Sequence, residues 1–447
     1  MKIIIAGAYA IGTHLARLLS RSREDITLID ESDERLASIG SDYDLLALNG
    51  QATSPRILRQ AGVDGADLFI AVTPLETTNI TAAILAKKLG AKRTVAKVDN
   101  PEFMTPQSQE LFVDMGVDKL IYPEMLAAVD INNGLKMSWV RQRWDVHDGA
   151  LVMLGIKLRE TCEILNRPLK DISGADDPYH IVAIKRGSDT IIPGGNDELK
   201  LNDLVYFMTT RNYIPFVRKI VGKEHYVDVK NVMIMGGGRT AVRTVKKMPE
   251  YMKCKVIEID EDRCEYLNEL LDENHTLIIH GDGRDIPLLT EEGIRNTQAF
   301  VALTGSAETN ILACLAAKRM GVRKTVAVVE NVDYVSMAES LDIGTIINKK
   351  MIAASYIYQM MLDADVINVS FLMNANADVA EFIAKEDSKV TKKPVKDLGL
   401  PVGVTIGGLV RDGEGILVSG NTHIEAGDSV MVFCHNVNMK KLEKYFA

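Results

Sequence analysis

A glycine-rich loop directly after an apolar run is the feature of this sequence that most clearly indicates chemistry. Residues 231–241 read NVMIMGGGRTA. In a dinucleotide-binding turn the first glycine makes the tight turn, the second lets the backbone approach the pyrophosphate, and the third small residue lets the helix pack on the strand. The N-terminus of that helix then faces the anion. The nucleotide-binding residues predicted in this loop are Gly236, Gly237, Gly238, Arg239, Thr240 and Ala241.

A second loop of this kind opens the chain, but it lacks the middle glycine. Residues 2–12 read KIIIAGAYAIG, in which Gly7 and Gly12 hold the outer positions and Tyr9 holds the middle one. A β-carbon and a ring at that place would crowd a phosphate, so nucleotide binding by this loop is the weaker expectation. The candidate residues here are Gly7, Ala8, Tyr9, Ala10, Ile11 and Gly12.

An acidic residue follows each glycine loop at the spacing of a ribose-binding carboxylate. Asp30 and Glu258 each end the next apolar run, about 20 residues after the first glycine. Such a carboxylate accepts hydrogen bonds from both ribose hydroxyls and repels a 2′-phosphate, which favours NAD over NADP. The alternative is a solvated charge at a strand end. Arg35 and Arg263 follow the two acids, where a guanidinium would cover the adenine or ribose or form a surface salt bridge.

Each half contains a series of apolar runs that are typical of buried strands, and further candidate residues follow the third and fourth of these runs at corresponding places in the two halves. Those after the third run lie where an adenine would bind, although an ordinary turn explains them equally well. Those after the fourth run lie beside the crevice that parallel sheets form at the carboxyl ends of their strands. The candidates are Gln51, Ala52, Asp282 and Gly283 after the third run, and Thr73 and Thr304 after the fourth.

Lys97 lies at the end of the fifth run, where the second half has Val328. It is a candidate phosphate contact in one half only, and a solvated lysine is the alternative. Asn79 and Asn310 begin the helix before that run, and we interpret them as helix caps.

The candidate residues recur because the chain contains the same half twice. Gly7 pairs with Gly236, Asp30 with Glu258, and the segment TNITAAILAKKLG with TNILACLAAKRMG, so the second copy lies about 230 residues after the first. An offset that stays nearly constant along a whole half indicates duplication. Each half begins with a long α/β pattern and ends with a short β-rich tail.

Buried strands that alternate with amphipathic helices must position these residues. In the first half KIIIAG, DITLID, DLLALNG, ADLFIAVT, KRTVAKVD and VDKLIYP are continuous apolar runs, separated by helical patterns. This order predicts an α/β fold with two doubly wound parallel-sheet, Rossmann-like domains. Each is followed by a small α+β domain, because the tails contain short alternating strands and turn dipeptides such as GS, GG and DG.

Two apolar segments with Met and aromatic residues join the sheets to the tails. We interpret them as linker helices that pack across a subunit or domain interface, and ordinary core helices are the alternative. The predicted domains are nucleotide-binding domains at 1–122 and 229–348, linker helices at 123–150 and 349–365, and small domains at 151–222 and 366–447.

Composition excludes several classes of protein. The formal net charge is −9, which disfavours nucleic-acid binding, because that needs cationic surface. No apolar run reaches the roughly 20 residues of a membrane-spanning helix, and the N-terminus enters a strand without a signal peptide. The 5 cysteines form neither a CxxC pair nor a metal-binding spacing, so we expect reduced thiols, a cytoplasmic protein and no metal site.

The sequence lacks the features of an enzyme. A dehydrogenase needs a proton donor or acceptor and a pocket over the nicotinamide, but the 8 histidines are not organised around either glycine loop. No P-loop, zinc spacing or nucleophile elbow appears. A non-enzymatic regulator is therefore favoured. The alternative is an NAD-dependent oxidoreductase built from duplicated Rossmann units.

The order of domains resembles that of the TrkA family, cytosolic regulatory subunits of bacterial Trk potassium uptake systems. The resemblance covers residues 1–447, and its most specific segments are SPRILRQAGVDGADLFIAVT and ETTNITAAILAKKLGAKRTVAKVDNPEF in the first half, with GDGRD and LLTEEGI in the second. In that family the two modules are named RCK-N and RCK-C. Lys97 falls where the family carries a basic residue near the phosphates, whereas Tyr9 departs from the family's middle glycine.

The resemblance implies a function that composition alone does not give. It implies a ring-forming homo-oligomer, a tetramer being the expected state, docked on the inner face of the cell membrane through a TrkH-type potassium channel. Binding of NAD, NADH, ATP or ADP would change the shape of the ring.

Overall fold

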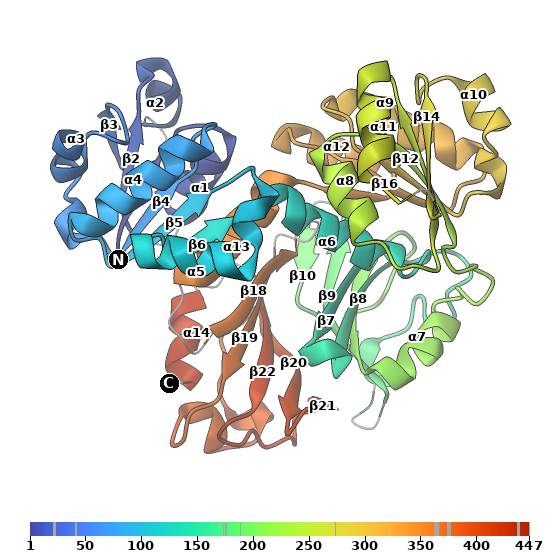
Figure 1. Ribbon diagram of the computed structural model, residues 1–447. Helices are drawn as coiled ribbons and strands as arrows, with labels where there is room; N and C mark the ends of the chain where they lie inside the picture. Colours follow the sequence, from blue (N-terminus) through green and yellow to red (C-terminus); the bar gives the residue numbers. More distant parts are fainter. Residues whose placement is uncertain are drawn as a thin grey trace. The chain divides into compact units, whose positions relative to one another are not determined.

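The computed structural model describes residues 1–20, 24–40, 43–172, 174, 177–187, 189–272, 274–361, 366–372, 377–435 and 439–446. The chain divides into two compact units. One consists of Met1–Leu126 and Lys349–Met361, and the other of Ala127–Asn348 and Leu362–Ala447. Figure 1 shows the elements of both units.

A doubly wound parallel sheet forms the body of the first unit. Its strands lie in the order β3-β2-β1-β4-β5-β6. Apolar runs form these strands because helices cover both faces, so that β1 and β4 are almost wholly buried. The strands are β1 (Lys2–Ala6), β2 (Asp25–Asp30), β3 (Leu46–Asn49), β4 (Leu68–Ala71), β5 (Arg93–Lys97) and β6 (Lys119–Ile121). The helices are α1 (Ala10–Ser20), α2 (Asp33–Gly40), α3 (Pro55–Gln60), α4 (Glu76–Lys88) and α5 (Pro106–Met115).

The strand order reverses beside β1, and this reversal places the candidate residues. Ala6 at the end of β1 pairs with Ile29 of β2 on one side and with Ala71 of β4 on the other. The three strands therefore end level. Helices leave β1 and β4 toward opposite faces at such a switch point, which opens a crevice at the carboxyl ends.

The second unit contains the same sheet again, in the order β14-β13-β12-β15-β16-β17. The fold class predicted from the sequence is confirmed. Its strands are β12 (Asn231–Met235), β13 (Lys253–Glu258), β14 (Thr276–His280), β15 (Ala299–Ala302), β16 (Lys324–Val328) and β17 (Thr345–Ile347). Its helices are α8 (Arg239–Lys246), α9 (Glu261–Leu270), α10 (Ile286–Glu291), α11 (Ala307–Arg319) and α12 (Val332–Ser340).

The first of the two linker helices differs from the prediction. Helix α6 (Pro123–Leu135) ends directly after Gly134, not at residue 150, and residues 142–146 form a strand, β7 (Gln142–Val146). In this strand Trp144 and Val146 alternate with polar residues, a strand pattern that the predicted helix overlooked, and β7 pairs with β8. Helix α13 (Lys349–Met361) packs on α1 in the first unit, while residues 362–365 lie outside the described part of the chain.

Each β-rich tail forms a five-stranded antiparallel sheet with a helix. The two sheets share one topology, in the orders β10-β9-β11-β8-β7 and β21-β20-β22-β19-β18. The first contains β7, β8 (Leu151–Lys157), β9 (Tyr179–Arg186), β10 (Asp189–Ile191), β11 (Leu204–Thr209) and α7 (Ile214–Ile220). The second contains β18 (Val366–Leu372), β19 (Ala377–Ile383), β20 (Val404–Arg411), β21 (Glu414–Leu417), β22 (Ser429–Cys434) and α14 (Met439–Phe446). Apart from the first linker, the domain boundaries given above remain our proposal.

The two small sheets pack against each other, because one apolar face of each contributes to a shared core. Met153, Tyr206 and Phe433 lie in a single buried cluster that both sheets contribute to. A β-carbon at Gly407 would lie 2.7 Å from Cγ1 of Val182, so glycine allows this close approach. His147 Nε2 also lies 2.6 Å from the buried carboxylate of Glu381. Duplication has therefore produced two sheets that bury their apolar faces against each other.

Among the described residues, none of the helices combines the length and the apolar character that crossing a bilayer requires.

Candidate functional site

A cavity of about 450 Å³ opens at the carboxyl ends of the strands in the second sheet. It lies where the strand order reverses between β12 and β15, as expected for a ligand site in this fold. Six of the residues predicted from the sequence line it: Gly236, Gly238, Glu258, Asp282, Gly283 and Thr304. This volume lies within the range of ordinary small-molecule sites.

The glycine loop after β12 presents backbone to this cavity. Gly236 has φ +98°, a left-handed conformation that side chains disfavour, and so makes the tight turn. A β-carbon at Gly238 would meet nothing within 4 Å, because that position faces open space. Helix α8 begins at the next residue, and its free N–H groups and positive dipole end suit an anion.

Glu258, at the end of β13, closes one side of the loop. Its Oε2 accepts a hydrogen bond of 2.6 Å from the N–H of Gly237, and its Oε1 accepts bonds from the N–H groups of Ile259 and Asp260. These three bonds fix the carboxylate at the cavity wall, where it can also accept bonds from ribose hydroxyls. Arg263 does not bind this carboxylate. Its Nε donates to the carbonyl of Gly237 at 2.9 Å, and its guanidinium lies over the ring of Tyr266.

The other loop residues of the second half have mixed placements. Asp282 lines the cavity and forms an ion pair of 2.6 Å with Arg284, which also lines it. Arg239 is exposed, Thr240 and Ala241 are buried in the base of α8, and none of the three is among the residues that line the cavity.

The first half repeats the glycine turn but has a tyrosine at the position of the middle glycine. Gly7 has φ +110°, and a β-carbon at Gly12 would lie 1.8 Å from the carbonyl oxygen of Gly7. Tyr9 stands where Gly238 opens onto the cavity. Its ring is 38% exposed and lies under the guanidinium of Arg35 at 4.2 Å. Ala8 is buried, and Ala10 and Ile11 begin α1 at the surface.

Asp30 is more heavily engaged than its counterpart Glu258. Its Oδ1 accepts from Nε and Nη2 of Arg35 and from the N–H of Ser32, and its Oδ2 accepts from the N–H of Ala8. The side chain is 3% exposed. Arg35 therefore neutralises the acid of the first half, whereas in the second half the matching Arg263 binds backbone instead.

The threonines that follow β4 and β15, Thr73 and Thr304, are each held by a buried asparagine. Asn310 Oδ1 accepts from the N–H and the hydroxyl of Thr304, and its Nδ2 donates to the carbonyls of Thr304 and Val328. Asn79 makes the same four bonds to Thr73 and Lys97. Both amides are 0% exposed. The interpretation of these residues as helix caps is wrong: they join the ends of two strands and thereby fix the crevice wall.

Three candidates of the first half are placed less favourably for ligand contact. Lys97 forms an ion pair of 2.9 Å with Asp99, and both side chains are mostly buried. Ala52 belongs to the hydrophobic core, whereas Gln51 is exposed on the turn after β3. Sequence reasoning also missed Arg284, Ser306 and Thr309, which line the cavity of the second half. Recurrence was an available signal for Thr309, which matches Thr78 of the first half, but not for Ser306, which matches Leu75.

Substitution of Gly12 by Ala tests the helix–strand contact. We expect Gly12→Ala to lower the free energy of unfolding of the first sheet by roughly 2–3 kcal/mol, because its β-carbon would collide with backbone. Ala241→Gly, at the matching place in the second half, is the control and should change stability by about 1 kcal/mol or less. Hydrogen exchange in β1 and β12 measures the two effects separately. Unchanged exchange in β1 of Gly12→Ala would contradict this geometry.

Comparison with known proteins agrees with this architecture. The TrkA-N domain model matches residues 3–123 and 232–349, and the TrkA-C domain model matches residues 153–222 and 379–447. Among solved structures, the GsuK RCK domain covers 100% of this chain and 94% of its own, with a TM-score of 0.60 and 14% identity. The GsuK channel bound to NAD gives a TM-score of 0.61 over 100% of this chain and 78% of its own, at 14% identity. These likenesses show the fold. The chain is thus a tandem TrkA-N/TrkA-C protein.

Full-length relatives make the assignment more specific. The Trk system potassium uptake protein TrkA of Vibrio alginolyticus is 31% identical, over 98% of this chain and 96% of its own length. The TrkA homolog of Archaeoglobus fulgidus is 29% identical over 100% of both. The chain belongs to the TrkA family of Trk system potassium uptake proteins.

Proposed function

We propose that this chain is a nucleotide-responsive, non-enzymatic regulatory subunit of a Trk potassium uptake system. The observation that supports this most directly is the open cavity of the second half, which is lined by the loop glycines and Glu258. The chain belongs to the TrkA family, and its TrkA-N domain occurs twice. Its relatives are named as potassium uptake proteins, and a solved structure of the same fold is a channel bound to NAD.

The ligand that fits the second crevice is an adenine nucleotide, and we propose NAD or NADH, with ATP and ADP as the other candidates. Helix α8 would face the phosphates, Glu258 would accept bonds from the ribose hydroxyls, and Asp282 and Gly283 would lie beside the adenine. The remaining sequence candidates are proposed as secondary contacts. In the first half, Arg35 and Tyr9 would have to move before a ribose could reach Asp30.

The proposed partner is a TrkH-type channel in the cell membrane, reached from its inner face by a ring of these chains, with a tetramer as the expected state. A ligand changes such an equilibrium only when its affinity differs between two shapes of the ring. Lys97 remains our candidate for a phosphate contact that makes this difference, and the phosphate would have to displace Asp99 from it.

Potassium flux into vesicles that hold the cognate channel tests this function. We expect the flux to change when the protein and a nucleotide are both present, and the nucleotide response to be lost in Glu258→Ala. Glu269→Ala removes an exposed acid of α9 and should keep the response. Flux that is identical with and without the protein, for NAD, NADH, ATP and ADP alike, would contradict the proposal. A response that survives Lys97→Ala would remove only the role assigned to Lys97.

A further inference from the structure

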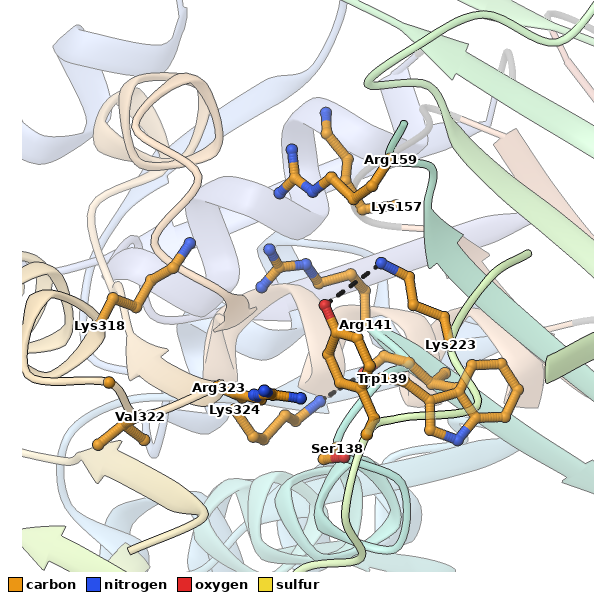
Figure 2. A pocket seen from close by; sticks show the side chains of 13 residues that line it. Ser138, Trp139, Arg141, Lys157, Arg159, Lys223, Lys318, Val322, Arg323 and Lys324 are labelled. Atoms are coloured by element: carbon orange, nitrogen blue, oxygen red, sulfur yellow. Dashed lines mark hydrogen bonds between the residues drawn. The ribbon is translucent and has the colours of Figure 1, made fainter. Parts of the chain in front are cut away.

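A second cavity in the chain, of about 470 Å³, is lined by basic side chains and lies away from the nucleotide crevice. Figure 2 shows these side chains around the open space. The crevice lies at the carboxyl ends of the second sheet, whereas this basic pocket lies at the other edge, where β16 begins, and beside the end of β8. The seven cationic residues that line the basic pocket are Arg141, Lys157, Arg159, Lys223, Lys318, Arg323 and Lys324.

One carboxylate, that of Asp342, compensates part of this charge. It pairs with Arg141 at 2.7 Å, with Lys318 at 3.1 Å, and with Arg159. Burial opposes ionisation of Asp342, but these three charges outweigh it and lower its pKa. Asp342 has φ +54°, a left-handed conformation that Asp adopts more readily than most side chains.

The other four cations are not neutralised. Within the described part of the chain, no carboxylate forms an ion pair with Lys157, Lys223, Arg323 or Lys324. Lys223 donates to the hydroxyl of Tyr226 at 3.3 Å, Arg323 to the carbonyl of His225, and Lys324 to Val140 O and Thr345 Oγ1. All these acceptors are neutral, so these hydrogen bonds do not compensate the positive charge of the pocket.

The duplicated half provides an internal comparison. Lys87 and Lys92 occupy the places of Lys318 and Arg323 in the first half, and each pairs with a carboxylate, that of Asp118 or Asp67. The position that matches Asp67 is Gln298 in the second half, which is neutral. The second half therefore has a cation, Arg323, at the place of Lys92, but no anion at the place of Asp67. A cation that served only to form this ion pair would not be needed without the anion.

Gathering like charges around open space is unfavourable unless an anion compensates them. Burial is the main reason why the pKa of Lys324 is lowered to about 7, and the charge of Arg141 lowers it further. Burial also lowers the pKa of Lys157, and Arg159 and Arg141 add to the effect while the carboxylates of Asp342 and Asp203 oppose it. A bound anion would favour the charged form of both lysines.

We propose that the basic pocket binds a small anion that carries two or more phosphate groups. Lys157 comes from the first small sheet, Lys223 from the segment after α7, and Arg323 and Lys324 from the second nucleotide domain. An anion held by all of them would join that domain to the small sheet. Several cations spread around about 470 Å³ suit a chain of phosphates better than a single one.

Calorimetric titration of the full chain with inorganic tripolyphosphate tests this site. We expect saturable binding, weakened about tenfold or more in Lys157→Gln/Arg323→Gln, because each charge-assisted hydrogen bond contributes that much affinity. The matched control is Lys392→Gln/Lys393→Gln, which removes two exposed lysines of the second small domain and should leave the affinity unchanged. Arg323→Gln alone changes one exposed side chain and serves if the double variant fails to fold.

Parallel titrations with ATP and sulfate identify the ligand. ATP that binds the pocket more tightly than tripolyphosphate indicates a nucleotide, and equal affinity indicates a free phosphate chain; both support the site. Sulfate that binds it as tightly as tripolyphosphate would overturn the requirement for several phosphates. Tripolyphosphate binding that is absent, or equally strong in Lys157→Gln/Arg323→Gln, would overturn the site itself.

Discussion

Replacement of Glu258 by Ala is expected to weaken binding of NAD or of another adenine nucleotide roughly ten- to hundredfold. The carboxylate is held at the cavity wall by three backbone N–H groups, and its loss removes the ribose contact and loosens the glycine loop. Asp30→Ala should reduce affinity less, because Arg35 already engages that carboxylate and Tyr9 occupies the space before it. Calorimetric titration with NAD, NADH, ATP and ADP measures both effects.

Two variants test whether the second half binds nucleotide more tightly than the first, and distinguish this difference in affinity from a general loss of structure. Glu269→Ala removes an exposed acid of the same region and should bind nucleotide as the unmodified chain does. Tyr9→Gly restores the middle glycine of the first loop and should strengthen binding there. Abolition of all binding by Asp30→Ala, together with no effect of Tyr9→Gly, would show that the ordering is wrong.

Asn310→Ala is expected to lower the free energy of unfolding of the second sheet domain by roughly 3–5 kcal/mol. Its amide is 0% exposed and forms four hydrogen bonds, and truncation leaves the buried carbonyl of Val328 and the half-buried N–H and hydroxyl of Thr304 without this partner. Each such orphaned group costs about 1–3 kcal/mol. Denaturant unfolding, with hydrogen exchange of β15 and β16, measures the change and locates it.

The control for this variant is Asn296→Ala, an exposed asparagine between α10 and β15, which should change stability by about 0.5 kcal/mol or less. Because Thr304 lines the nucleotide cavity, Asn310→Ala should also weaken nucleotide binding. Unchanged exchange in β15 and β16 would mean that the four bonds do not hold the strand ends together.

Local pattern was sufficient for the α/β order of both halves. Buried parallel strands must be continuous apolar runs, and helices that cover them must be amphipathic, so both leave a direct record in the sequence. The glycine turns at Gly7 and Gly236 were predictable for the same reason, since a left-handed backbone needs glycine. The first linker was predicted as a helix too far along the chain. Residues 142–146 read QRWDV, in which Trp144 and Val146 alternate with polar residues as in a strand, and they form β7, which pairs with β8 along its whole length.

What the sequence by itself determined is therefore the duplication, the two parallel sheets and the loop residues that line the cavity of the second half. Only the tertiary structure decided which partner each of these side chains has. Arg35 pairs with Asp30 while Arg263 binds a carbonyl, Asn79 and Asn310 join strands rather than cap helices, and the two small sheets share one core. The basic pocket is also of this kind, because Arg141, Lys157 and Arg323 are distant in sequence and meet only in the folded chain. Periodicity records which face of an element is buried, whereas pairing between elements depends on distances that no local pattern contains.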